Sequence, residues 1–304
     1  MNAAPPPRAL VVGEALVDVT RAPDGAVAEH PGGSPLNVAV TMARQGIDTT
    51  LAAHVGDDRL GRIIRDHLAG SGVSLVEVGP SGSTGSATAT LDAGGAATYE
   101  FDFHWDPDRL PDPEGYDVVH VGSLGAWLAP GATAVAALVR RAHAAGHAVG
   151  LDPNVRPALA PGAVHLRERV LDLAAHSRWV KLSDEDADVL ADGTADPLSV
   201  LAELADRGPA LAALTRGGQS TVLRSADREV EVEVPRVEVV DTIGAGDTWM
   251  GALLAELLLR GWVERTSFSA DELGELGQVA AGAAAIAVSR PGADPPWRGE
   301  HLPG

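Results

Sequence analysis

The chain has 304 residues, a formal net charge of −19, 45% hydrophobic residues and no cysteine. The missing cysteines exclude disulfides, thiolate nucleophiles and cysteine-bound metals, and an acidic charge without any basic block argues against a nucleic-acid partner. No apolar run approaches the roughly 18–20 residues that a membrane span needs, so no membrane partner is expected. The chain starts with MNAAPPPRALVV, which has a proline run where a signal peptide needs an apolar stretch, and this indicates an untargeted, cytoplasmic protein.

Strand-like runs alternate with helix-like runs along the chain. The strand candidates are 9–19, 49–56, 117–123, 147–153, 178–183 and 210–217. Most of them are apolar on both faces, as buried parallel strands are. The helices between them have readable starts and ends: one with Ser34 as N-cap, Pro35 at N1 and Gly46 as its C′ residue, one starting at Asp57 or Asp58, and one following Pro130.

This alternation predicts an α/β fold, a doubly wound parallel sheet with helices on both faces. Residues 84–103 differ, because they alternate at period two around the pair Gly94–Gly95 and so predict an antiparallel hairpin. Together with the stretch near 20–30, the hairpin is expected to form a small β lid, roughly 18–31 and 84–106. No repeat or low-complexity linker divides the chain, so residues 1–304 are expected to form one domain plus this lid.

The most informative stretch is DTIGAGDTWMGALLAELLLRG, residues 241–261. The alternating segment 229–240 predicts a strand that leads directly into it. Gly244, Ala245 and Gly246 then open an apolar helix that ends at Gly261. The first amides of a helix have no intrahelical acceptor, and no bulky side chain shields them here, so the pattern predicts an anion site strengthened by the helix dipole.

Asp247 stands in the first turn of this helix, where a carboxylate is stable in its ionised form. An ionised aspartate is a weak base, which suits phosphoryl transfer because the proton of the attacking hydroxyl leaves late in a loose transition state. The alternative is that Asp247 only caps the helix. Competing motifs are absent from the sequence: there is no GxxxxGK[ST], no GxGxxG after a strand and no GxSxG.

A second informative stretch is HPGGSPLNVAVTMARQG, residues 30–46. Gly32 and Gly33 allow a small polar ligand to approach the backbone, and Asn37 lies about one turn into the following helix. Asp18, in GEALVD, adds a carboxylate near the end of the first strand. A carboxylate and an amide at one strand edge suit a polyol, although an ordinary glycine turn before a capped helix explains the same residues.

Both stretches resemble the two signatures of the ribokinase-like (PfkB) sugar kinases. The likeness extends along the chain through DPNVRP (152–157), KLSDED (181–186), LTRGGQS (214–220) and AAIAVSRPGADPPW (284–297), all in family order. The resemblance implies transfer of the γ-phosphate of ATP to a sugar hydroxyl. Asp247 then takes the hydroxyl proton, and the amides from Gly244 to Asp247 hold the charge that develops on the phosphoryl group.

The resemblance also implies binding roles for the other quoted residues. The sugar is expected to contact Asp18, Gly32, Gly33 and Asn37. The nucleotide is expected to lie along Lys181, Ser183, Thr215, Gly217, Gly218 and Gly246, with the helix at 271–288 bordering the adenine. Arg156 either meets phosphate or substrate or forms a structural salt bridge. Phe101, Phe103 and Trp105 either line the sugar or close the hairpin on its own hydrophobic face.

Mg²⁺ is expected with the nucleotide, because a cation must bridge its phosphates. Likeness to the family also implies K⁺ beside the anion site, at positions Asp241, Ile243, Ala287, Arg290 and Gly292. The family's Asn-x-x-Glu element appears here as Ser183-Asp184-Glu185-Asp186, so the acid that helps to organise Mg²⁺ is either Asp186 or Glu185.

GEALVD, DPNVRP and VGSLGAWLAPGA are most similar to the bacterial fructokinase branch of the family. The leading hypothesis is therefore a fructokinase that makes fructose 6-phosphate, working as a homodimer joined through the lid. A 2-keto-3-deoxygluconate kinase or another sugar kinase of the family is the first alternative. The second alternative is a sugar- or nucleotide-binding protein without turnover, which only the altered element at 183–186 supports.

Overall fold

The computed structural model describes residues 5–92, 97–156, 165–191 and 195–302, which form a nine-stranded sheet and a separate four-stranded sheet. The strands of the large sheet, in spatial order, are β13 (Arg228–Glu233), β12 (Ser220–Ser225), β11 (Leu211–Thr215), β10 (Trp179–Ser183), β9 (Ala148–Asp152), β8 (Val118–Gly122), β1 (Arg8–Val12), β4 (Asp48–Ala53) and β5 (Ser74–Glu77). The strands from β11 to β5 in this order are parallel to one another, whereas β12 and β13 are antiparallel additions at one edge.

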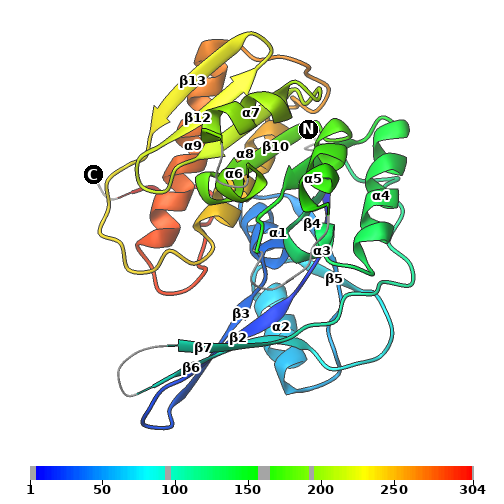
Figure 1. Cartoon of the computed structure of the whole chain (residues 1–304), viewed down its shortest axis with the longest axis vertical. Helices are drawn as coiled ribbons and strands as arrows, with labels where there is room; N and C mark the ends of the chain where they lie inside the picture. The colour runs from blue at the N-terminus through cyan, green and yellow to red at the C-terminus, as the bar shows by residue number, and fades with distance from the viewer. Residues whose placement is uncertain (1–4, 93–96, 157–164, 192–194, 303–304) are drawn as a thin grey trace.

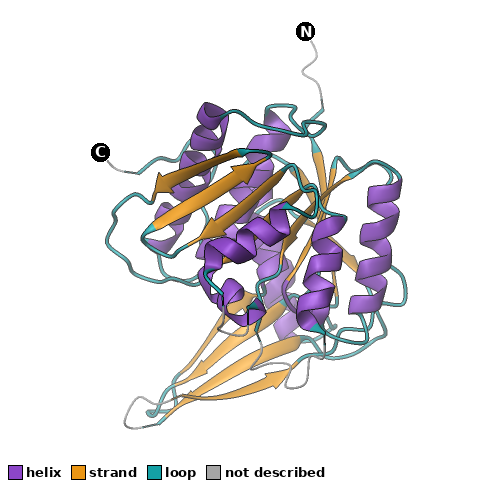
Figure 2. Cartoon of the chain, turned by 45° about the horizontal axis from the view of Figure 1, so that its top comes forward, coloured by secondary structure: helices purple, strands orange, loops and turns teal. Residues whose placement is uncertain are grey.

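Helices cover both faces of the large sheet (Figures 1 and 2). One face carries α1 (Ser34–Arg44), α2 (Arg59–Gly70), α8 (Ala245–Leu259) and α9 (Ala270–Val288), and the other carries α3 (Ser123–Trp127), α4 (Ala132–Ala144), α5 (Leu166–Ala175), α6 (Asp184–Leu190) and α7 (Pro197–Ala205). In β1, Ala9 and Val11 pack into the first core and Leu10 and Val12 into the second. This two-sided burial explains the continuous apolar strands and confirms the predicted doubly wound fold. None of the described helices is both long and apolar enough to span a bilayer.

The order of the strands reverses between β1 and β8. After β1 the chain adds β4 and β5 on one side of this point, and it then adds β8, β9, β10 and β11 on the other side. Ligands of open α/β sheets bind at such a switch point, beyond the carboxyl ends of the strands. Gly13 follows β1 here with a φ of 156°, and a Cβ at this position would lie 2.4 Å from the Pro35 ring. The start of α1 therefore packs directly on the end of β1.

The small sheet projects from the body as a ribbon-like lid (Figure 1). Its strand order is β3 (Val27–Gly32), β2 (Leu16–Arg21), β6 (Gly85–Leu91), β7 (Ala97–Asp102), and β6 and β7 pair antiparallel, as the hairpin prediction requires. The predicted Gly94–Gly95 turn lies outside the described residues. The prediction of one strand over 9–19 is wrong, because the chain leaves the large sheet after Val12 and enters the lid as β2.

Two other predicted boundaries need correction. The strand predicted over 229–240 ends at Glu233, and Val239 and Val240 are 60% and 55% exposed in the irregular segment that follows. The helix predicted to have Ser34 as its N-cap is capped by Gly33 instead, with a φ of 104°, so Ser34 is the first helical residue. The start of α2 is as predicted, because the Asp58 carboxylate accepts the Gly61 amide at 2.7 Å.

Candidate active site

Asp247 is buried in the first turn of α8, and its carboxylate faces the start of α1. The Ser34 hydroxyl donates to Oδ1 at 2.6 Å, and the Asn37 amide donates to Oδ2 at 2.8 Å. Both carboxylate oxygens are thus oriented by a neighbouring helix. This geometry favours a role for Asp247 beyond capping its own helix, and its role as the base stays a prediction.

The amides at the start of α8 form the predicted anion site in part. The Ala245 amide donates to the Thr242 carbonyl at 3.3 Å, so it is not free. The amides of Gly246 and Asp247 have no acceptor among the residues that the structure describes. Gly244 adopts a left-handed φ of 74°, and a Cβ there would lie 2.7 Å from that of Ala293, so only glycine fits.

Ser34 has a role that differs from the predicted one, and Asn37 makes a contact that the sequence does not predict. The hydroxyl of Ser34 binds a carboxylate rather than capping α1, because a charge-assisted hydrogen bond is stronger than a neutral one. The amide nitrogen of Asn37 donates to Asp247, and the predicted contact of Asn37 with the sugar stays a prediction. Both residues therefore aim the candidate base.

Asp18 lies on β2 of the lid, beside the glycine pair that precedes α1. Its Oδ2 atom would be only 2.2 Å from a Cβ at Gly32, so the carboxylate occupies the space that a side chain there would take. A Cβ at Gly33 would lie 2.7 Å from the Glu14 carbonyl. Burial raises the pKa of Asp18 to about 6, and the charge of His30, its cross-strand neighbour, partly opposes this. The two glycines thus border both Asp18 and the base-aiming residues of α1.

The three aromatic residues that follow the lid hairpin separate into different environments. Phe101 is in register with Ala87, which is in register with Asp18, so Phe101 and Asp18 share one face of the lid; Phe101 is 45% exposed. Phe103 is half-buried against Gly85 at the base of the lid. Trp105 is fully buried, and its indole donates to the Gly125 carbonyl at 3.0 Å, so it belongs to the core. Phe101 and Phe103 thus stay candidates for contact with a ligand, whereas Trp105 does not.

Glu14 is a functional candidate that the sequence patterns do not single out. It lies in the short connection between β1 and β2, is almost fully buried, and accepts the Gly125 amide at 2.9 Å. Burial raises its pKa to about 6, although hydrogen bonds from Ser123 and Gly125 oppose the rise. An acid immediately after Gly13, inside an otherwise apolar run, is the signal that marks it in the sequence.

The predicted nucleotide residues gather at the carboxyl ends of β10 and β11. Ser183 and Thr215 are register partners there, and Gly217 and Gly218 form the turn beyond β11 with open space around both. Lys181, two residues before Ser183, is buried, and its ammonium group is 2.9 Å from Asp152 Oδ2. Its contact with the nucleotide stays a prediction.

Asp186 is a structural acid in this fold. Its Oδ2 accepts the Ser183 amide at 2.8 Å and its Oδ1 accepts the Val155 amide at 2.6 Å, while Ser183 caps the helix in return. Glu185 is exposed. The prediction that Asp186 organises Mg²⁺ is not what this geometry favours, because both of its oxygens are used by the backbone.

No cluster of three or more metal-ligating side chains is present in the described part of the chain. The residues that the structure describes therefore offer no side-chain cage for Mg²⁺. A site with few protein ligands still fits Mg²⁺ that is bound to the phosphates of a nucleotide, because Mg²⁺ keeps several of its waters.

The positions that the resemblance gives to a monovalent cation lie in the loop before α8, in the last turn of α9 and in the loop after α9. Asp241 connects the two loops, since its Oδ1 accepts the Ile243 amide at 3.0 Å and its Oδ2 accepts the Gly292 amide at 2.9 Å. At the end of α9, the Val288 carbonyl accepts the Asp241 amide at 3.2 Å, and the Ala287 carbonyl accepts the Arg290 amide at 3.0 Å. The structure thus brings together Asp241, Ile243, Ala287, Arg290 and Gly292, and their role as cation ligands stays a prediction.

Arg156 is exposed just beyond β9. Its guanidinium donates to the neighbouring Val155 carbonyl at 3.0 Å and makes no ion pair with any described residue. The structural salt bridge considered from sequence is therefore not present within that part of the chain.

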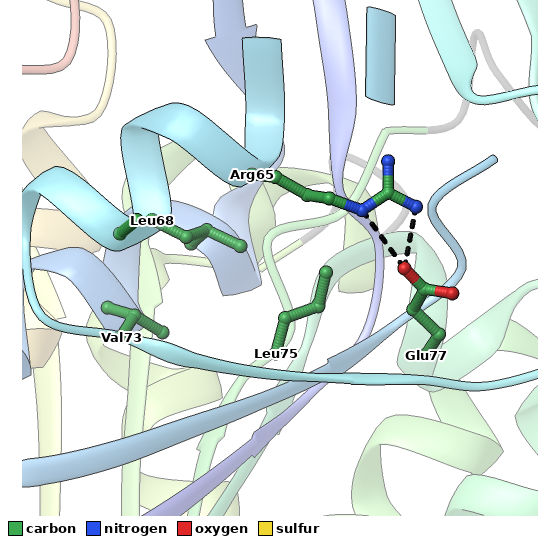
Figure 3. Close-up of a pocket in the computed structure, with 6 residues that line it drawn as sticks. Arg65, Leu68, Val73, Leu75 and Glu77 are labelled. Carbon is green, nitrogen blue, oxygen red and sulfur yellow. Dashed lines mark hydrogen bonds and ion pairs between the residues drawn. The ribbon is translucent and has the colours of Figure 1, made fainter. Parts of the chain in front are cut away.

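A surface hollow between α2 and β5 contains none of the candidate residues. Figure 3 shows Leu68, Val73 and Leu75 lining it beneath the ion pair of Arg65 with Glu77, whose side chains approach to 2.6 Å. It lies along the edge strand β5, two strands away from β1 and the switch point.

Comparison with known proteins agrees with this fold. The profile of the family described as pfkB family carbohydrate kinase matches residues 7–298, and the chain belongs to this family. The chain is 33% identical over 262 residues to a fructokinase of Rhizobium leguminosarum bv. trifolii, an alignment that covers 82% of this chain and 79% of that protein.

Two solved fructokinase structures are similar to the fold. That from Xylella fastidiosa with bound ATP has a TM-score of 0.81 and 27% identity, covering 94% of this chain and 93% of that one. That from Vibrio cholerae O395, in a form with fructose, ADP and calcium ion bound, has a TM-score of 0.80 and 25% identity, covering 94% of each chain. The protein is accordingly an ATP-dependent carbohydrate kinase.

Proposed function

We propose that the protein is a fructokinase that transfers the γ-phosphate of ATP to the 6-hydroxyl of fructose. The observation that carries the proposal is the geometry of Asp247, whose two oxygens are oriented by Ser34 and Asn37 beside two unpaired helix amides. The similarity to fructokinases, one of them with bound ATP and one with fructose and ADP, supports the choice of substrates.

Each group at the start of α8 has a defined task in this reaction. The sugar hydroxyl oxygen attacks the γ-phosphorus, the bond from that phosphorus to the bridging oxygen of ADP breaks, and the hydroxyl proton passes to the Asp247 carboxylate. The amides of Gly246 and Asp247 donate hydrogen bonds to the phosphoryl oxygens, whose charge they stabilise together with the helix dipole. The nucleotide enters as MgATP, so the metal is part of the substrate.

The lid supplies the sugar side of the site. Asp18, on the same face of the lid as Phe101, offers carboxylate oxygens to sugar hydroxyls, and Gly32 and Gly33 allow close approach of the sugar to the backbone. Closure of this sheet over the site excludes water, which would otherwise accept the phosphoryl group. The sugar contacts of Arg156 and Phe103 and the contacts of Thr215, Gly217 and Gly218 with ATP belong to the same proposal.

A panel assay tests the proposed substrate. ADP release is measured with MgATP and each of fructose, ribose, 2-keto-3-deoxygluconate, adenosine and tagatose, with and without K⁺. We expect fructose to have the highest kcat/KM, and we expect K⁺ to raise the rate if Asp241 and Gly292 frame a cation site. A higher kcat/KM for 2-keto-3-deoxygluconate than for fructose would identify the protein as a 2-keto-3-deoxygluconate kinase. No activity with any sugar would favour a binding protein without turnover.

The lid is also the expected site of self-association. It is a single four-stranded sheet projecting from the body, and Phe101 leaves a large apolar side chain exposed on one face. We expect sedimentation or solution scattering at micromolar concentration to show a dimer, and Phe101→Asp to weaken it. Glu100→Ala is the matched control, because Glu100 is exposed on the opposite face of the same strand. A strictly monomeric wild-type protein contradicts this prediction.

A further inference from the structure

Lys181 is the one lysine in the sequence, and it is buried in the middle of β10. Its side chain is 4% exposed, and Nζ lies 2.9 Å from Oδ2 of Asp152, whose side chain is fully buried at the end of β9. This is a rare position for a lysine, since an ammonium group loses strong hydration on burial. In a chain of net charge −19, it places a positive charge next to the candidate reaction site.

The ammonium group adjoins the anion site from the inside. A Cβ at Gly246 would lie 2.9 Å from Lys181 Nζ, so the ammonium fills the space that any other residue at 246 would need. Gly246 carries one of the two unpaired amides at the start of α8. A fixed positive charge immediately behind these amides strengthens their attraction for a phosphoryl group, because the surroundings are shielded from water.

Asp152 is the group that fixes this charge. Its Oδ1 has no hydrogen-bond partner among the described residues, so Lys181 is the one side chain there that it binds. His120 lies nearby on β8, but burial lowers its pKa to about 3, so its ring is neutral and does not compete for the carboxylate as a cation. Burial lowers the pKa of Lys181, but the negative charges of Asp152, Asp186 and Asp247 together raise it by more. The net shift of this pKa is upward, so the amine stays protonated.

Stability alone does not account for such a pair. Replacing a buried ion pair by apolar residues of similar volume is often neutral or stabilising, because desolvation offsets the attraction. A functional use of the positive charge accounts for it better.

We propose that Asp152 is a positioning residue that holds the Lys181 ammonium group behind the Gly246 amide, where its charge stabilises the phosphoryl group during transfer. The inference rests on the proposed function, because it assumes that a phosphoryl group occupies the site. It concerns the charge beneath the anion site and leaves the identity of the sugar open.

Kinetics of three variants test the proposal. We expect Lys181→Met to lower kcat about 10- to 50-fold, somewhat less than the loss of a direct hydrogen-bond donor to the transition state. Asp152→Asn keeps the shape of the side chain and is expected to lower kcat about 5- to 10-fold, with the fructose KM within about twofold of wild type. The double variant Lys181→Met/Asp152→Asn has no unpaired buried charge, and we expect kcat as low as in Lys181→Met. A folded double variant with wild-type kcat would show that the pair is only structural.

A spectroscopic measurement reads the ammonium group directly. Because the chain has a single lysine, enzyme labelled with ¹⁵N at lysine Nζ gives one side-chain signal. We expect MgADP with inorganic phosphate to shift this signal in the wild type, and Asp152→Asn to move and broaden it without ligand. If the enzyme phosphorylates fructose but its lysine signal does not change when these ligands are added, the inference about Lys181 is wrong and the proposed function stands. An enzyme inactive on every sugar whose signal still shifts overturns the proposed function and supports the position of the Lys181 ammonium group beside the phosphate site.

Discussion

We expect Asp247→Ala to lower the turnover number for sugar phosphorylation by about 10²- to 10⁴-fold while ATP still binds. The carboxylate is the acceptor for the hydroxyl proton, and Ser34 and Asn37 hold both of its oxygens in place. The two unpaired amides are backbone groups and remain after the substitution, so the site for the phosphates is kept. Steady-state kinetics with MgATP and fructose gives the turnover number, and titration calorimetry with MgATP gives the affinity.

The matched control for this variant is Glu256→Ala, which removes a carboxylate from the same helix where it pairs with Arg260 at the far end. Turnover in this control is expected to stay near the wild-type value. Thermal melts of both variants check that the fold is intact, since Asp247→Ala leaves two buried donors without their acceptor. A folded Asp247→Ala enzyme with near wild-type turnover would remove Asp247 as the base.

Removing the lid carboxylate should produce the second large effect. We expect Asp18→Ala to lower kcat/KM for fructose by about 10²- to 10⁴-fold, because hydrogen bonds to a charged group contribute about 1.5–3 kcal/mol each and a sugar can donate two. The loss should be smaller for MgATP, whose KM is measured at saturating fructose. An unchanged kcat/KM for fructose would show that Asp18 does not contact the sugar.

The same residue gives a stability prediction with a definite sign. Burial raises the pKa of Asp18 from 3.8 to about 6, so the folded state holds its proton more tightly than the unfolded state does. Stability contributed by this group is present at low pH and is lost as pH rises from about 4 to 6. We therefore expect the neutral variant Asp18→Asn to melt above the wild type at pH 7.5 and to lose this advantage near pH 4. A lower Tm at pH 7.5 would contradict this account.

The fold class was predictable because two-sided burial leaves a local trace, namely short apolar runs separated by helices. The division of residues 9–19 into two strands was not predictable from the sequence. Both β1 and β2 are largely buried, so the change of sheet at Gly13 does not interrupt the apolar pattern. The predicted strand over 229–240 was too long for a different reason, because the alternating pattern continues past the end of β13. A strand needs a hydrogen-bonding partner, and beyond Glu233 the residues have none in the sheet.

The candidate site likewise has features that the local sequence predicts and features that it does not. Asp247 and the glycines before it were predictable, because helix starts and left-handed turns are set by neighbouring residues. The pairing of Asp247 with Ser34 and Asn37 spans more than 200 residues, so no local pattern encodes it. The burial of Lys181 against Asp152 likewise depends on how β9 and β10 lie together in the sheet.

The central claim is that Asp247 and the start of α8 move a phosphoryl group from ATP to a sugar hydroxyl. ³¹P NMR of the purified enzyme with MgATP and fructose follows every phosphorus atom in the reaction. We predict that the γ-phosphate signal decays as a sugar monophosphate signal at the 6-position grows in equal amount, with wild-type enzyme and not with Asp247→Ala. Persistent ATP, or inorganic phosphate in place of the sugar phosphate, would contradict the account.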